Sequence, residues 1–383
     1  MIKRIPIVAT PIPINEGLGS VRALENFKSG LLKFTGRRYA FLLNSATSCV
    51  FVALRALNNI SGVKKVILPA YTASSLVIAV KKAGLTPALV DISLKDFQID
   101  LKAAGEAQGD DISCVICPHM FGITVKGMGE FKQKFPKALV IEDCAQALGG
   151  IVDGKPVGSS GDISVLSFNR GKNMPTYSGG CALTDDKGLA ADMEKQLSDI
   201  EDEDQAFESL LPLRIFALSV LVRPRFYALA YPFLAGLKDR KPADDFKVKK
   251  YTSRAAVTGS SLLRRIGALS RKRYENGLRL IEGLRGAPGL ILPEISAGSK
   301  PAFNRFPLVF EDLNRKKKAV RGLSRAGIES SEMYLEPLHH LFGLGYEKFD
   351  FPNSVYLARH LLTLPVHPYV DVAAIEKMIK IIR

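Results

Sequence analysis

The sequence contains no tryptophan, and only five cysteines and five histidines occur among its 383 residues. So few cysteines, in an odd number, exclude a disulfide-stabilised secreted scaffold and favour a reducing compartment, so we expect a cytoplasmic protein. Pro6, Pro11 and Pro13 interrupt the N-terminus, which lacks the apolar core of a signal peptide. Internal repeats and low-complexity tracts are also missing, which excludes solenoid and fibrous architectures.

Acidic residues are outnumbered, with 38 Asp and Glu against 53 Lys and Arg, and the formal net charge is +15. This excess predicts attraction to an anion, whether a phosphorylated small molecule, an acidic membrane surface or nucleic acid. The basic run at 316–318 is expected to be a solvated helix face. Because 47% of the residues are apolar, the chain is not disordered, and its length suits about two domains.

The first half of the chain alternates strand-like and helix-like patterns. Strands are predicted at 39–45, 66–70, 86–92, 113–119, 138–144, 162–168 and 180–186, and helices at 46–59, 75–84 and 126–135. The predicted strands are apolar on both faces and are separated by helices. We therefore predict the α/β class, with a mostly parallel sheet covered on both sides.

Composition changes in the second half. Residues 210–237 are strongly apolar but contain three arginines and three prolines, and the last 85 or so residues show an α+β pattern. We expect a large domain over 1–250, with an apolar insert over 205–245, and a smaller α+β domain over 251–383.

The apolar segment 210–237 has two interpretations. Its prolines and arginines leave no run of the roughly 20 apolar residues that a membrane span needs. Residues 210–250 could instead make peripheral contact with the inner membrane surface, helped by the basic residues that follow the apolar part. The interpretation we favour is a set of helices packed at a domain or dimer interface.

Polar residues gather where the predicted strands end. Residues 44–48 follow the first strand at a helix start, where backbone N–H groups attract an anion. Asp143 and Gln146 follow a later strand, Ser167 ends the next one, and Lys172 comes five residues on. Since ligands bind at the carboxyl ends of parallel strands, these groups are expected at one edge of the sheet.

Such groups suit pyridoxal phosphate, which needs an amine for a Schiff base, a carboxylate for its ring nitrogen, and hydroxyls with a helix N-terminus for its phosphate. A free lysine has a pKa of roughly 10.4, and burial beside a cation would lower it. No histidine or cysteine spacing indicates a metal site, and we expect none. Cys114 and Cys117 lie within an apolar strand pattern, so we expect them in the core.

Ordered blocks along almost the whole chain resemble the DegT/StrS-like sugar aminotransferases, which are pyridoxal-phosphate enzymes with the aspartate-aminotransferase fold, fold type I. The blocks are NSATS, VILPAYTASSLVIAVKKAGLTPALVDISLKDFQID, VIEDCAQALGGIVDGKPVGSSGDISVLSFNRGKN, MYLEPLHH and LLTLPVHP. The resemblance implies that Lys172 forms the internal aldimine and moves the proton. It also implies that Asp143 pairs with the ring nitrogen and that Gln146 lies against the ring. Three further residues would hold the phosphate: Ala46, Thr47 and Ser167.

Three residues are weaker candidates for substrate contact: Tyr71, His119 and His339. A hydrogen-bonded core histidine is the alternative for His119. Ala73 stands where the family often has an aromatic residue that stacks on the cofactor, so the stacking comes from elsewhere, with Tyr71 as the candidate, or is weaker. Thr252 stands where an asparagine usually crosses to the partner's phosphate.

The resemblance implies a homodimer that transfers an amino group from glutamate to a nucleotide-linked keto-sugar, in polysaccharide or glycoconjugate biosynthesis. A nucleic-acid partner is not expected, because no binding motif is present. The lysine at position 172 argues against the related dehydratases, which have histidine there. The alternative is a non-catalytic or regulatory binding protein of the same fold, associated with a membrane surface.

Overall fold

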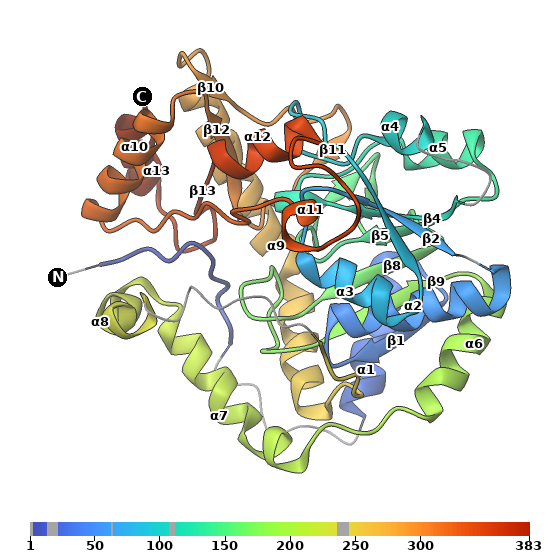
Figure 1. The fold of residues 1–383 in the computed structure, drawn as a ribbon. Helices are drawn as coiled ribbons and strands as arrows, with labels where there is room; N and C mark the ends of the chain where they lie inside the picture. The colour runs from blue at the N-terminus through green and yellow to red at the C-terminus, as the bar shows by residue number, and fades with distance from the viewer. Residues whose placement is uncertain (1–2, 14–21, 63, 107–111, 236–244) are drawn as a thin grey trace.

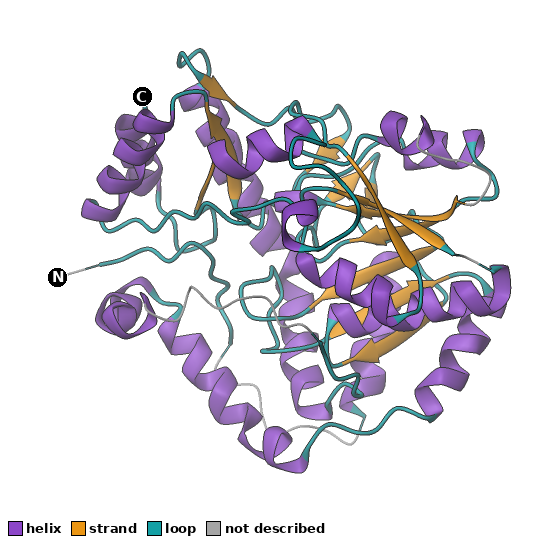
Figure 2. Ribbon diagram, viewed as in Figure 1, coloured by secondary structure: helices purple, strands orange, loops and turns teal. Residues whose placement is uncertain are grey.

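The computed structural model describes residues 3–13, 22–62, 64–106, 112–235 and 245–383 (Figure 1). A seven-stranded sheet forms the centre of the molecule (Figure 2). Its strands, in spatial order, are β1 (Tyr39–Leu43), β9 (Gly180–Thr184), β8 (Ile163–Ser167), β5 (Leu139–Asp143), β4 (Ile112–Pro118), β2 (Lys65–Pro69) and β3 (Thr86–Val90). Strand β9 is antiparallel to both of its neighbours, and the other adjacent pairs are parallel. The predicted α/β class with a mostly parallel sheet is therefore confirmed.

Helices cover both faces of this sheet because successive strand residues point to opposite sides. In β8, for example, Val165 packs in one core cluster and Leu166 in another. One face carries α2 (Ala46–Ser61), α3 (Ser74–Lys82) and α6 (Lys187–Ser198). The other carries α1 (Ala23–Thr35), α4 (Leu101–Glu106), α5 (Met128–Lys134) and the first half of α9 (Ser253–Leu284).

The C-terminal part forms its own α+β layer. An antiparallel sheet of β10 (Leu290–Ile291), β12 (Phe306–Phe310) and β13 (Leu361–Leu364) packs with α10 (Leu313–Arg325), α12 (Pro352–His360) and α13 (Val372–Ile382). The end of α9 belongs to this core through Leu280 and Leu284, so one helix runs through both parts. A small third sheet joins β11 (Ser299–Lys300) to β6 (Ile151–Val152) and β7 (Lys155–Pro156).

The N-terminal stretch lies against the C-terminal layer. Ile5 forms a parallel bridge with Ile328, and the backbone N–H of Arg4 donates to the carbonyl of Pro224 at 3.0 Å. His367 Nε2 lies 2.7 Å from the carbonyl oxygen of Pro6. The two ends of the chain therefore pack together.

The apolar insert predicted over 205–245 is described up to residue 235, and its residues 236–244 lie outside the described ranges. The described part contains two helices, α7 (Gln205–Leu221) and α8 (Pro224–Ala235), which meet at a bend of 105°. Within the described ranges, neither helix alone has the length and apolar character of a membrane span. Only the two taken together meet that criterion, and the bend separates them.

Helix α9 packs closely on α1 at Gly259, where a Cβ atom would lie 2.6 Å from Phe27 Cζ. We expect Gly259→Ala to lower the free energy of unfolding by about 1–3 kcal/mol, because the added methyl group overpacks this contact. Gly267 lies in the same helix with nothing within 4 Å of such an atom. Gly267→Ala should therefore raise the free energy of unfolding by up to about 1 kcal/mol. Chemical denaturation measures both, and equal effects would contradict the described α1–α9 contact.

Candidate active site

The structure brings most of the predicted site residues to one edge of the large sheet, because β1, β2, β4, β5 and β8 all run in one direction. Each residue follows the carboxyl end of its strand. They are Ala46 and Thr47 after β1, Tyr71 after β2, His119 after β4, Asp143 and Gln146 at and after β5, and Ser167 and Lys172 at and after β8.

The start of α2 offers an anion site at this edge. Ser45 is the N-cap, and its hydroxyl accepts a hydrogen bond from the N–H of Ser48 at 3.0 Å. The N–H groups of the first helical residues, Ala46 and Thr47, have no intrahelical acceptor and favour a phosphate there. Gly180 packs directly beneath, since a Cβ atom there would lie 2.5 Å from the nitrogen of Ala46. A glycine is therefore required for the strand to approach this helix start.

Lys172 and Asp143 influence each other's ionisation. Burial lowers the pKa of Lys172 to about 8, Asp143 opposes this shift, and the Arg305 guanidinium adds to it. Burial raises the pKa of Asp143, while the N–H of Ala145, which donates to Oδ1 at 3.0 Å, and the positive charge of Lys172 counteract the rise. The amine and the acid therefore share one low-dielectric region, as the proposed cofactor requires.

The backbone of Lys172 is held from the opposite side. The Thr10 hydroxyl donates to the carbonyls of Lys172 and Asn173 at 3.3 and 3.2 Å. It accepts in turn from the buried guanidinium of Arg273 at 3.0 Å, and Arg273 also donates to the carbonyl of Ala9 at 2.7 Å. Helix α9 thus positions the lysine loop through the N-terminal stretch.

His119 supports the site from within the core. Its Nδ1 accepts from the N–H of Val125 at 2.8 Å, so Nε2 carries the hydrogen and points to Glu142 Oε1 at 3.1 Å. Both ring nitrogens are therefore used inside the protein, which corresponds to the core-histidine alternative. The backbone N–H of His119 donates to the carbonyl of Asp143 at 3.0 Å and ties β4 to β5.

Glu142 is almost fully buried, and its carboxylate accepts five hydrogen bonds. Besides His119, its donors are the backbone N–H groups of Gly158, Ser160 and Gly161 and the hydroxyl of Ser164, at 2.8 to 3.2 Å. Burial alone would raise the pKa of Glu142, but these donors lower it to about 2. Cys144 brings its sulfur within 4.8 Å of the His119 and Glu142 ligand atoms. Since the Glu142 oxygens already accept these five donors, we interpret this trio as structural support for the neighbouring Asp143.

Glu142→Gln tests this support through the pH dependence of stability. The pKa of Glu142 is lower in the folded protein, about 2 against an ordinary 4.5, so its contribution is present above pH 4.5 and is lost as the pH falls toward 2. We expect wild type to exceed Glu142→Gln in unfolding free energy by about 3 kcal/mol at pH 7, and the difference to narrow below pH 4.5.

Denaturant unfolding at a series of pH values measures the difference. Ser164→Ala, which removes one donor to the same carboxylate, should show a smaller loss. A difference between wild type and Glu142→Gln that stays constant with pH would contradict the ionised state of Glu142.

Other polar groups at the sheet edge can still form hydrogen bonds to a ligand. Gln146 Oε1 accepts from the N–H of Phe121 at 3.1 Å, but its amide nitrogen has only the sulfur of Met120 at 3.7 Å. Among the described residues, the hydroxyl of the fully buried Tyr71 has no hydrogen-bond partner. Buried polar groups normally form hydrogen bonds, so the Tyr71 hydroxyl and the Gln146 amide nitrogen fit a bound polar group such as pyridoxal phosphate.

Two side chains from the C-terminal layer complete the site and were not predicted. The ring of Tyr334 packs 5.6 Å from that of Tyr71. Burial raises the pKa of Tyr334, the Arg305 charge opposes this rise, and the Asp143 charge adds to it. Arg305 has a buried Nε without a hydrogen-bond partner in the described chain, and its charge lowers the pKa of Lys172. The available signal was an arginine interrupting the apolar run FNRFPLVF and a tyrosine in MYLEPLHH.

Two other residues named in the sequence analysis, His339 and Thr252, have surroundings different from those of the Lys172 site. His339, in α11 (Leu338–Leu341), packs against the rings of His340 and Phe351 at 4.3 and 5.2 Å. The carboxylates that interact electrostatically with it are Asp350 and Asp91, the latter directly after the outermost strand β3. No described contact joins His339 to Lys172. The hydroxyl of Thr252 caps α9 by accepting from the N–H of Ala255 at 3.2 Å.

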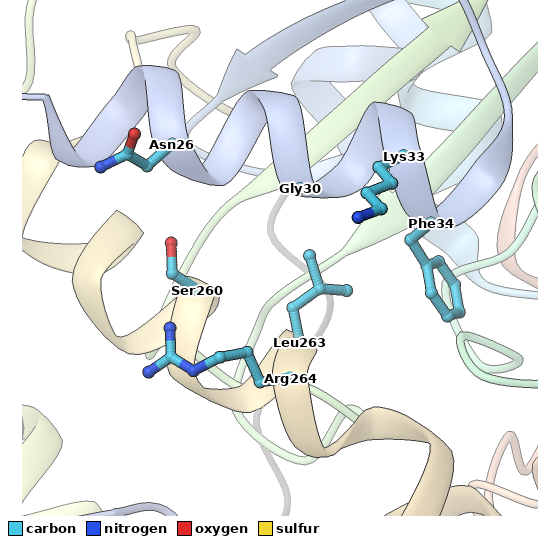
Figure 3. Close-up of a pocket in the computed structure, with 7 residues that line it drawn as sticks. All are labelled: Asn26, Gly30, Lys33, Phe34, Ser260, Leu263 and Arg264. Atoms are coloured by element: carbon cyan, nitrogen blue, oxygen red, sulfur yellow. The ribbon is translucent and has the colours of Figure 1, made fainter.

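A hollow of about 670 Å³ lies elsewhere, between α1 and α9 (Figure 3). Seven residues line it: Asn26, Gly30, Lys33, Phe34, Ser260, Leu263 and Arg264. Figure 3 shows Leu263 of α9 directed toward Gly30 of α1, where a Cβ atom would lie 3.0 Å from Leu263 Cδ2. None of these seven residues is a predicted site residue, so this hollow is separate from the Lys172 edge.

A family model describes residues 18–383 as DegT/DnrJ/EryC1/StrS aminotransferase. The chain belongs to this family. It is 27% identical over 372 residues to the UDP-N-acetyl-3-dehydro-alpha-D-glucosamine 3-aminotransferase of Acidithiobacillus ferrooxidans, covering 94% of this chain and 87% of that protein. It is 23% identical to the spore coat polysaccharide biosynthesis protein SpsC of Bacillus subtilis, covering 94% and 88%.

Solved structures share the fold. DesV of S. venezuelae, in complex with a ketimine intermediate, has a TM-score of 0.76 at 22% identity, with 96% of this chain and 89% of that chain covered. Spr1654 of Streptococcus pneumoniae, in its PLP form, has a TM-score of 0.75 at 20% identity, with 98% and 97% covered. These structures confirm the expected fold type I architecture. The family match confirms the expected aminotransferase activity and, with it, pyridoxal phosphate as the cofactor.

Proposed function

We propose that this aminotransferase moves an amino group from glutamate to a nucleotide-linked keto-sugar, in polysaccharide or glycoconjugate biosynthesis. The observation that carries the proposal is the Lys172 amine, with a pKa of about 8, electrostatically coupled to the buried Asp143. The sugar acceptor is supported by the names of relatives, which include a dTDP-3-amino-3,4,6-trideoxy-alpha-D-glucose transaminase and a GDP-perosamine synthase.

Different residues at the sheet edge would hold different parts of the cofactor. Pyridoxal phosphate supplies a carbonyl that exchanges amino groups and a ring that acts as an electron sink. Asp143 would keep the ring nitrogen protonated, and Gln146 would face the ring with its amide nitrogen. The phosphate would lie at the start of α2, where the N–H groups of Ala46 and Thr47 and the hydroxyl of Ser167 can donate to it.

Lys172 Nζ takes the role of base and acid. With a pKa of about 8, roughly one amine in ten is neutral at pH 7, against fewer than one in a thousand for an ordinary lysine. The neutral amine accepts the proton from the substrate carbon and returns it later, as a positioned general base does. Burial and the charge of Arg305 keep this neutral fraction available.

We propose a homodimer as the working unit, because the resemblance implies active sites completed by a partner chain. Thr252 stands at the position that would cross to the partner, and its hydroxyl already caps α9. A cytoplasmic location suits the five cysteines, which are all free and buried. The non-catalytic alternative is not favoured, since the lysine, the carboxylate and the helix start lie at one sheet edge in a family of transaminases.

Lys172→Ala should lower amino transfer from glutamate by at least about 100-fold, because the general base is lost. The visible absorption of the enzyme-attached cofactor should disappear as well. Lys155→Ala, at an exposed lysine of the same domain, serves as the matched control and should retain both. Retention of the absorption band in Lys172→Ala would overturn the assignment of the lysine.

The ionisation of Lys172 has its own test. In the cofactor-free protein, acetylation of the Lys172 amine should rise with pH to a midpoint near 8, because only the neutral amine reacts. Mass spectrometry of the labelled peptides compares it with Lys155 in the same sample. A midpoint for Lys172 at or above 10 would contradict the described burial.

A further inference from the structure

The outward side of α7 and α8 is apolar, which is unusual for surface helices. Six large side chains on it are exposed, and we call them the α7–α8 face: Leu210, Leu213, Phe216, Phe226, Leu229 and Phe233. Leu229 and Phe233 are 74% and 83% exposed. A patch of this size commonly marks an interaction surface.

The spacing of these residues follows the helical repeat. Leu210, Leu213 and Phe216 recur every three residues along α7, while Leu211 and Ile215 between them are buried against the large-domain core. Helix α8 repeats the pattern at Phe226, Leu229 and Phe233. An ordinary surface helix has one apolar side facing the core and a polar side facing water. Here the side facing water is apolar as well.

The two helices lie at the margin of the molecule (Figure 1). In this view α7 runs along the lower edge, α8 is seen nearly end-on beyond it, and no other described element lies outside them. The face is therefore open in the described part of a single chain.

The charged residues within α7 and α8 themselves are mostly positive. Between Gln205 and Phe233 the charged residues are Arg214, Arg223, Arg225 and Glu208. The Ser253 hydroxyl donates to Glu208 at 3.3 Å. The acidic stretch 199–204 before α7 is partly neutralised, since Lys249 contacts Glu201 at 2.5 Å and Lys250 contacts Asp202 at 3.5 Å. Arg225 is exposed beside these leucines and phenylalanines and matches anionic lipid headgroups above an acyl layer, whereas the Arg214 guanidinium lies over the rings of Phe207 and Tyr177.

We propose that the α7–α8 face docks on the surface of an anionic lipid bilayer. The 105° bend and the internal Pro212 and Pro232 suit two helices lying in the interface rather than crossing the membrane. The net charge of +15 adds long-range attraction to such a surface.

Docking would bring the bilayer close to the lysine loop. The Arg214 guanidinium lies 5.8 Å from the ring of Tyr177, five residues after Lys172, and Phe207 packs its ring 6.3 Å from the same tyrosine. Helix α7 thus forms an outer support of this loop. The proposal does not depend on the transfer reaction, so Lys172→Ala should bind vesicles as wild type does.

Vesicle co-sedimentation of the cofactor-loaded full chain tests the proposal. We expect binding to vesicles of phosphatidylcholine with phosphatidylglycerol, weaker binding to phosphatidylcholine alone, and weakening with salt. The double variant Leu229→Glu/Phe233→Glu should lower the affinity by about tenfold or more, because charges replace two exposed apolar side chains that the bilayer would cover. Leu213→Glu/Phe216→Glu tests α7 in the same way.

Phe349→Glu is the matched control, since Phe349 is 79% exposed but lies outside this face. It should bind vesicles as wild type does, and thermal melts should show all variants folded. Absence of binding to the anionic vesicles would overturn the proposal. So would variants that keep wild-type vesicle binding but change from a larger to a smaller species in sedimentation velocity, because the face would then cover a second copy of the chain.

Discussion

The arrangement of the site depends on one buried guanidinium. Arg273, on α9, donates to the carbonyls of Phe303 and Asn304 in the C-terminal layer and to Ala9 and Thr10 in the N-terminal stretch, at 2.7 to 3.3 Å. Burial lowers its pKa to about 9, so the fold bears the cost of holding a desolvated cation. In return, two distant parts of the chain, the N-terminal stretch and the C-terminal layer, share one hydrogen-bond donor on α9 next to the Lys172 loop.

The same principle explains the chemistry of the site. Buried cations disfavour another positive charge nearby, and Arg305 acts in this way on Lys172. Asp143 limits the effect, so the amine titrates close to neutrality instead of staying neutral throughout. The carboxylate next to Asp143 in the chain, Glu142, accepts hydrogen bonds from five protein donors. It therefore contributes rigidity rather than proton exchange. Two adjacent acids on β5 therefore differ: Glu142 is held by protein donors, while Asp143 is coupled to Lys172.

The strands and the edge cluster were predictable because apolar runs and strand ends are local features of the sequence. The placement of Lys172 and Asp143 at one sheet edge followed from the predicted strand ends, whereas their separate roles toward the cofactor came from the family resemblance. Arg305 and Tyr334 were missed because the C-terminal layer folds back over the edge from more than 130 residues away in the chain. Lys316, expected in solvent, is buried and pairs with Glu332 at 2.5 Å, since α10 packs on its own layer through the lysine stem.

The buried cysteines have a practical consequence. All five thiols lie in the core, at Cys49, Cys114, Cys117, Cys144 and Cys181, and burial raises the pKa of each. Alkylating reagents attack the thiolate, so the native chain reacts with them very slowly. A single cysteine introduced on any exposed helix can thus carry a fluorophore or spin label without prior removal of the natural ones.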